Sequence, residues 1–162
     1  MTRTDAIAVV GATATGKTTL AESLARAFAA EEVCADSRQV FAELEIGSGR
    51  PTPAERAARP HHLFAALHLG QHASAGWYAR AAEETCDGIR ARGRPALLVG
   101  GSGLYLRALR EGLAATPPHD AAVRARLRVE FEARGADALH ERLAAVDPAS
   151  AARLAPRDRQ RV

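Results

Sequence analysis

The clearest chemical signature in this chain is a glycine-rich loop close to the amino terminus. The stretch GATATGKT matches the phosphate-loop pattern G-x-x-x-x-G-K-[ST]. Backbone N–H groups of such a loop point at phosphate oxygens, the lysine reaches the outer phosphate, and the last hydroxyl can bind Mg²⁺. We therefore predict a phosphate site with Thr18 as a metal ligand. The predicted phosphate-binding residues are Gly11, Ala12, Thr13, Ala14, Thr15, Gly16, Lys17 and Thr18.

The lysine of this loop is also unusual in the composition of the chain. The chain has 22 basic residues, and Lys17 is the only lysine among them. A compact ammonium suits a phosphate loop, in which the forked guanidinium of arginine would not fit. The retained lysine therefore supports a working phosphate site.

Two polar residues follow predicted strands and are the next candidates for chemistry. Asp36 follows the short strand predicted at 32–35, and Ser102 follows the one predicted at 96–101. Because parallel strands bring their carboxyl ends to one edge, both residues are expected near the phosphate loop. Asp36 could bind Mg²⁺ or act as a general base, and the alternative is a helix N-cap. The glycines before Ser102 could equally form a plain strand-to-helix turn.

The elements that position these residues alternate between strand and helix. We predict strands at 6–10, 32–35 and 96–101, and helices at 17–30 and 74–93. Ser74 is the expected N-cap of the second helix, and the apolar positions of the first are Leu20, Leu24, Ala27 and Phe28. This alternation is typical of an α/β fold with a parallel sheet and flanking helices, like that of phosphate-loop NTPases. Sheets of this class usually have about five or six strands. With about three, the domain looks truncated at its carboxyl end.

Several residues between these elements receive structural interpretations. The stretch at 51–63 is predicted to be a loop-rich connection, because it holds three prolines. His61 and His62 are a weak metal signal, and we favour a structural or surface role for them. Trp77 and Tyr78 are expected in the core rather than in stacking contacts with bases.

The last part of the chain has helical periodicity only. We assign residues 1–117 to an incomplete α/β core and residues 118–162 to the start of a helical insertion. Arginines outnumber acidic residues only after residue 80. Taken alone, this charge distribution favours an ordinary arginine-rich surface. The predicted core-facing positions of this segment are Val123, Leu127, Phe131, Leu139, Leu143 and Val146.

Composition excludes several classes of protein. No apolar run approaches the roughly 20 residues of a membrane helix, and no signal peptide is recognisable at the amino terminus. Cys34 and Cys86 form no disulfide framework and are interpreted as free thiols of a reducing compartment. We therefore expect a cytoplasmic protein, and a monomer.

Six segments, in this order, resemble the tRNA dimethylallyltransferases, which are also called tRNA isopentenyltransferases. They are GATATGKT, ADSRQVF, IGSGRPT, PHHL, LLVGGSGLYLRAL and DRQRV. The resemblance implies transfer of a dimethylallyl group from dimethylallyl diphosphate, with Mg²⁺. The acceptor would be the exocyclic amine of the adenine 3′ to the anticodon, in tRNAs that read codons beginning with U. It also implies that the helical segment grips the anticodon stem-loop and that the target adenine is flipped out.

The resemblance also implies roles for individual residues. Asp36 takes the place of the general base, and Ser102 stands where the family usually has threonine. The sequence departs from the family at IGSGRP, where IGTAKP is usual, and at HLFAALHLGQHAS, where an acidic run is usual. The implied tRNA contacts are Asp36, Ser37, Arg38, Gln39, Ser102, Arg124, Gln160 and Arg161.

Other functions use the same motifs. A phosphate-loop kinase would bind ATP in the loop and use Asp36 as the base for a hydroxyl group of a small metabolite or nucleotide. Prenyl transfer to free adenine nucleotides is a closer alternative, which the DSRQ stretch and the helical segment argue against. An inactive remnant that binds phosphate or RNA is the non-enzymatic alternative.

Overall fold

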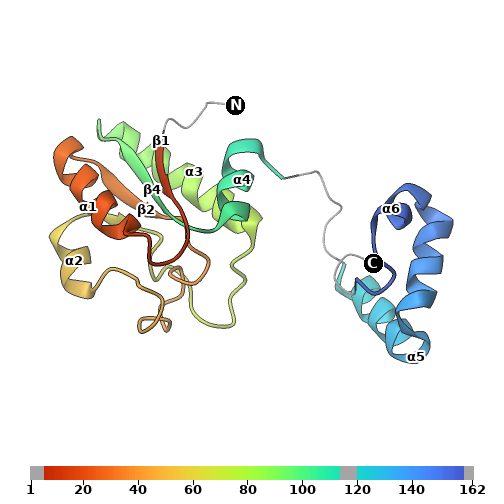
Figure 1. Cartoon of the computed structure of the whole chain (residues 1–162). Coiled ribbons are helices and arrows are strands. Elements are labelled where there is room, and N and C mark those ends of the chain that lie inside the picture. The colour runs from red at the N-terminus through yellow and green to blue at the C-terminus, as the bar shows by residue number, and fades with distance from the viewer. Residues whose placement is uncertain (1–5, 114–119, 159–162) are drawn as a thin grey trace. The chain divides into compact units, whose positions relative to one another are not determined.

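A computed structural model describes residues 6–113 and 120–158 of the chain (Figure 1). The chain forms two compact units, residues 1–114 and 115–162. Each unit is described by itself below.

The first unit is built on a four-stranded parallel sheet. Its strands are β1 (Ala6–Val10), β2 (Glu31–Cys34), β3 (His61–His62) and β4 (Ala96–Gly100), and their order is β1-β4-β2-β3. The predicted α/β class with a parallel sheet is confirmed. The sequence predicted only three of these strands, because β3 is two residues long.

Helices cover both faces of this sheet. On one face, α1 (Lys17–Phe28) packs on β1 and β4. On the other, α3 (Ala75–Ala91) and α4 (Gly103–Glu111) pack against each other and on the sheet. Figure 1 shows α1 and the α3–α4 pair on opposite sides of the strands. The Ser74 side chain caps α3 by accepting from the Trp77 N–H, as predicted.

The buried face of α1 is formed by small residues. The apolar positions in the predicted helix were Leu20, Leu24, Ala27 and Phe28, but Leu20 and Phe28 are each more than half exposed. The two small residues Ala21 and Ala25 are buried instead, because they let the helix axis approach the sheet closely.

The segment at 51–63 is more ordered than predicted. It contains α2 (Pro53–Ala58) as well as β3. The Thr52 side chain accepts from the Glu55 N–H, and the Glu55 carboxylate accepts from the Thr52 N–H, so the two form a capping box. The prolines therefore start a helix here rather than prevent one.

Trp77 and Tyr78 lie in the core as predicted, and the two cysteines are buried there as well. Tyr78 is fully buried and stacks on Tyr105 with ring centroids 4.2 Å apart. Trp77 packs against the same cluster. Cys34 and Cys86 are buried free thiols, and burial raises their pKa to about 12 and about 11, respectively.

The second unit is helical, with α5 (Ala121–Val146) and α6 (Pro148–Arg153). Two of its predicted core positions are wrong, because Val123 is 38% and Val146 is 76% exposed. The other four are partly buried. Gly135, with φ 81° and ψ −179°, interrupts the helical conformation inside α5, so a single unbroken period cannot describe both of its parts. No helix in the described parts of the chain is both long and apolar enough to cross a membrane.

Candidate functional site

The glycine-rich loop connects the carboxyl end of β1 to the first turn of α1 (Figure 1). Gly16 is the N-cap residue of α1, with φ 80°. The Thr15 hydroxyl donates to the Ala12 carbonyl oxygen over 2.8 Å, and the Lys17 ammonium donates to the same oxygen. One carbonyl therefore ties both side chains to the loop, which places the lysine charge and the amino end of a twelve-residue helix at one position.

Close backbone packing brings two further loops to this position. A Cβ atom on Gly100, the last residue of β4, would lie 2.2 Å from the carbonyl carbon and oxygen of Ala35. On Gly101 it would lie 3.1 Å from the carbonyl oxygen of Gly11. Only glycine fits at the end of β4, and the loops after β1, β2 and β4 therefore meet there.

Asp36 and Ser102 lie in this junction. The Ser102 N–H donates to the Ala35 carbonyl over 3.0 Å, and the Ser102 Oγ accepts from the Ser37 N–H over 2.8 Å. Asp36 Oδ1 accepts from the N–H groups of Arg38 and Gln39 over 2.9 and 3.3 Å. Asp36 therefore caps a turn, and no helix follows it. Ser102 is the N-cap residue of α4, but its side chain holds the neighbouring loop rather than the helix.

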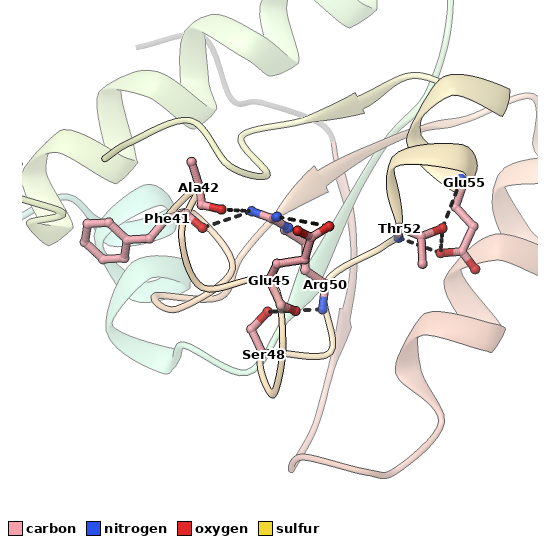
Figure 2. A network of polar contacts seen from close by, with 7 residues as sticks. All are labelled: Phe41, Ala42, Glu45, Ser48, Arg50, Thr52 and Glu55. Atoms are coloured by element: carbon pink, nitrogen blue, oxygen red, sulfur yellow. Dashed lines mark hydrogen bonds and ion pairs between the residues drawn. The ribbon is translucent and has the colours of Figure 1, made fainter. Parts of the chain in front are cut away.

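A second loop supports the turn that carries Asp36. The Gln39 amide donates to the Ser48 carbonyl over 2.8 Å. The Arg50 side chain is 3% exposed, and its Nη1 donates to the carbonyls of Phe41 and Ala42 over 3.0 and 3.1 Å (Figure 2). Arg50 thus closes a loop that begins where the Asp36 turn ends. Sequence reasoning missed this role, because a contact with main-chain carbonyls leaves no pattern of residue types.

The predicted site residues therefore fall into three groups. The phosphate loop, the Asp36–Gln39 turn and Ser102 lie together at the carboxyl edge of the sheet. Arg124 lies in α5 of the second unit. Gln160 and Arg161 lie outside the described residues.

Comparison with known families decides the assignment. The model of the IPP transferase family matches residues 39–162, and that of the isopentenyl transferases matches residues 4–63. The chain belongs to the IPP transferase family.

Individual members of this family are similar over nearly the whole chain. A tRNA dimethylallyltransferase of Sorangium cellulosum is 52% identical over 156 residues, which are 96% of this chain and 50% of the relative. One of Phenylobacterium zucineum is 50% identical over 154 residues, again 50% of the relative. The chain thus spans about half the length of the curated relatives it matches.

Solved structures agree with the fold. The full-length tRNA isopentenylpyrophosphate transferase of Bacillus halodurans aligns with a TM-score of 0.66 and 32% identity, over 96% of this chain and 52% of that one. A eukaryotic dimethylallyltransferase acting on tRNA aligns with a TM-score of 0.77 and 25% identity, over 94% and 38%.

The amino ends of the strands, opposite the phosphate loop, carry a charged cluster that sequence reasoning missed. At the amino end of β2, the buried Glu31 carboxylate accepts from Arg92 Nε and Nη2 over 3.2 and 2.6 Å. His62 Nε2 lies 2.7 Å and Arg94 Nη1 3.6 Å from the same carboxylate. The hydrogen bonds from Arg92 lower the pKa of Glu31 below its usual value. An open cavity of about 620 Å³ lies over these side chains, and no residue of the phosphate loop lines it.

Next to this cluster, Glu32 of β2 and His61 of β3 form a second buried acid–histidine pair, with a longer contact. The side chains of His61 and Glu32 are 1% and 2% exposed, and His61 Nε2 lies 3.8 Å from Glu32 Oε2. His61 Nδ1 lies 2.9 Å from the Arg59 carbonyl, which can only accept, so a neutral ring carries its proton on Nδ1. Burial raises the pKa of Glu32. The two histidines are therefore structural residues that join β3 to acids of β2, in line with the favoured interpretation.

Proposed function

We propose that this chain is the diphosphate-binding part of a tRNA dimethylallyltransferase. The protein would transfer the dimethylallyl group of dimethylallyl diphosphate to the exocyclic amine of the adenine 3′ to the anticodon, in tRNAs that read codons beginning with U. The observation that carries this proposal is the junction of three loops at one sheet edge, where the phosphate loop packs on Gly101 and the backbone at Ala35 and Asp36 packs on Gly100. The names of the relatives support the choice of substrate.

The loop would bind the diphosphate of the donor. The Lys17 ammonium now donates to the Ala12 carbonyl and would turn to a phosphate oxygen, which is a stronger acceptor because it is charged. The amino end of α1 adds a favourable dipole. Together these groups would stabilise the negative charge that develops on diphosphate as it leaves.

The residues present fit Mg²⁺ as a cofactor. Thr18 is exposed in the first turn of α1 and offers a hydroxyl oxygen, a hard ligand of the kind that Mg²⁺ prefers. Among the described residues, no group of three histidine, cysteine or carboxylate side chains could hold a metal ion without a substrate. Thr18 would therefore hold Mg²⁺ together with diphosphate oxygens, where the ion would neutralise charge on the leaving group.

Asp36 would take up the proton of the acceptor amine. In the transfer, a bond forms between the amine nitrogen and the first carbon of the prenyl group. The bond from that carbon to the diphosphate oxygen breaks, and the electron pair leaves with diphosphate. The proton lost by nitrogen passes to the Asp36 carboxylate, which two turn amides hold in place. Ser102 orients this turn through its contact with the Ser37 N–H.

The turn itself would contact the tRNA. Ser37 and Arg38 are exposed beside Asp36, and Arg124 lies in the helical unit. Arginines in both places suit a phosphate backbone. We further propose that the protein acts in the cytoplasm, since its two cysteines are buried free thiols.

Two measurements test this function. The first is calorimetric binding of dimethylallyl diphosphate with Mg²⁺ to the purified chain, and we expect Lys17→Ala to abolish it. The second is transfer of label from the radioactive donor to unmodified tRNA, by the chain joined to the second half of the Sorangium cellulosum relative. Asp36→Ala should remove transfer but not donor binding, while Asp87→Ala, an exposed residue of α3, should change neither. Turnover of ATP without label in tRNA would instead support a kinase.

A further inference from the structure

The cavity at the amino ends of the strands is lined by more positive than negative groups. Its volume is about 620 Å³, and the residues that line it are Glu31, Pro60, His62, Arg92 and Arg94. Two of these residues are arginines and one is an acid, so the lining has a net positive charge even when the imidazole is neutral. None of these residues belongs to the proposed prenyl-transfer site, so the positive charge of the cavity calls for another ligand.

The buried carboxylate of Glu31 holds the donors of this cavity in place without using all of them. Its side chain is 3% exposed and accepts from Nε and Nη2 of Arg92. A guanidinium has five N–H donors in a fixed fork, so Arg92 keeps donors that this carboxylate does not take. Arg94 Nη1 lies 3.6 Å from Glu31 Oε1, which is too long for a hydrogen bond. The two arginine side chains are 50% and 46% exposed, so both can reach a ligand.

Backbone hydrogen bonds fix the segments that carry these side chains. After α3, Gly93 adopts φ 72° and turns the chain between the two arginines. The Glu31 N–H donates to the Pro95 carbonyl over 3.0 Å, which ties β2 to the segment after this turn. The Glu32 N–H donates to the Pro60 carbonyl over 3.3 Å, which ties β2 to the start of β3. The donors are thus held in place before a ligand binds, and this lowers the entropic cost of binding.

The donors and the size of the cavity indicate its ligand. Guanidinium groups bind phosphate through paired, charge-assisted hydrogen bonds. We propose that the cavity binds the phosphate group of a small molecule through Arg92 and Arg94, beside His62. The volume is in the range of pockets for small ligands, which leaves room for more than the phosphate group.

The limited extent of the positive charge favours a small ligand over a nucleic acid. The preceding arginine of α3, Arg90, does not line the cavity and is paired with Asp87 at 3.2 Å. The site therefore presents two arginines at one place. A nucleic-acid backbone is bound by a longer patch or stripe of basic residues.

Binding of inorganic phosphate tests this site. The phosphate loop would also bind this probe, so every sample carries Lys17→Ala, and a negative result would not bear on the proposed prenyl transfer. The measurement follows the Nε–Hε NMR signals of Arg92 and Arg94 in about 0.15 M NaCl, which screens attraction between exposed charges. We expect both signals to shift with a dissociation constant on the order of 1 mM. Signals that do not move at phosphate concentrations well above this value would overturn the proposal.

Two matched arginine substitutions localise the binding. Arg94→Ala removes one proposed donor, and Arg90→Ala is its control, because the two side chains are 46% and 45% exposed. Arg94→Ala should weaken phosphate binding at least about ten-fold, whereas Arg90→Ala should leave it unchanged. Both variants should keep the thermal midpoint of the parent chain, which shows that they remain folded. Equal weakening by the two substitutions would indicate a diffuse attraction and contradict the site.

Two further probes identify the source of the phosphate group. Adenosine monophosphate is a phosphate monoester, and a short single-stranded RNA without terminal phosphates has only phosphodiesters. Tighter binding of the monoester than of inorganic phosphate would assign the cavity to a phosphorylated metabolite, and the reverse order would assign it to free phosphate; both results support the proposal. If the RNA bound more tightly than both and Arg94→Ala removed its binding, the cavity would be a nucleic-acid site and the proposal would be wrong.

Discussion

Two consecutive glutamates of β2 should respond to pH in opposite directions. Glu31→Gln removes a buried carboxylate that Arg92 and His62 contact at 2.6 and 2.7 Å. Loss of one partner from a fully buried ion pair costs about 3–5 kcal/mol. Arg92 and Arg94 are about half exposed and can return to water, so we expect about 1–2 kcal/mol at pH 7.

The sign of each pH dependence follows from the direction of the pKa shift. The pKa of Glu31 is lowered from about 4.5 by its hydrogen bonds from Arg92, so its contribution is present above pH 4.5 and is lost as pH falls through the folded-state value. The pKa of Glu32 is raised by burial, so its contribution is present below about pH 4.5 and is lost as pH rises through the folded-state value. The deficit of Glu31→Gln should therefore shrink towards pH 3.

Glu32→Gln should behave in the opposite way. A neutral amide removes the cost of burying an ionised carboxylate, which His61 and Arg59 offset only in part and which Glu22 increases. The variant should therefore gain stability relative to the native chain as pH rises from 4 to 8. Urea unfolding followed by Trp77 fluorescence, at pH intervals between 3 and 8, measures both curves. Parallel curves for the two variants would refute the assignment of opposite pKa shifts.

Three further predictions concern the site and its support. Gly100→Ala should lower the free energy of unfolding by about 3 kcal/mol or prevent folding, because its Cβ atom would lie 2.2 Å from the carbonyl group of Ala35. The control Gly88→Ala in α3 should be neutral or stabilising, and thermal unfolding of both variants checks this. Arg50→Ala should lower the free energy of unfolding by about 2 kcal/mol, because it leaves the carbonyls of Phe41 and Ala42 without their donor. It should also make residues 43–49 sensitive to protease, whereas the control Arg107→Ala on the surface of α4 should have neither effect. Lys17→Arg should weaken calorimetric binding of diphosphate at least about ten-fold, and full binding by this variant would contradict the need for a compact ammonium.

The parts of the fold that follow from residue patterns could be predicted from the sequence. Apolar runs gave the strands at 6–10 and 96–101, and Ser74 marked the start of α3. The rule that parallel strands end at one edge correctly brought Asp36 and Ser102 together. The roles of these residues in catalysis remain predictions.

The features that were missed depend on contacts rather than on patterns. The strand β3 has two residues and exists because Glu31 and Glu32 of the neighbouring strand hold its histidines. The capping box of α2 was readable as Thr-Pro-Ala-Glu, but the prolines around it suggested a loop. In α5, Gly135 breaks the helical period, so positions before and after it do not share one face.

The order of the strands sets the width of the proposed site. The phosphate loop follows β1 and Asp36 follows β2, and β4 lies between them. Two strand spacings of about 4.8 Å place the backbones of β1 and β2 about 10 Å apart. Because β4 ends at Gly100 and Gly101 follows it, the floor of this gap is bare backbone. If the proposed function is right, this spacing would leave room above β4 for a prenyl diphosphate between the phosphate loop and Asp36.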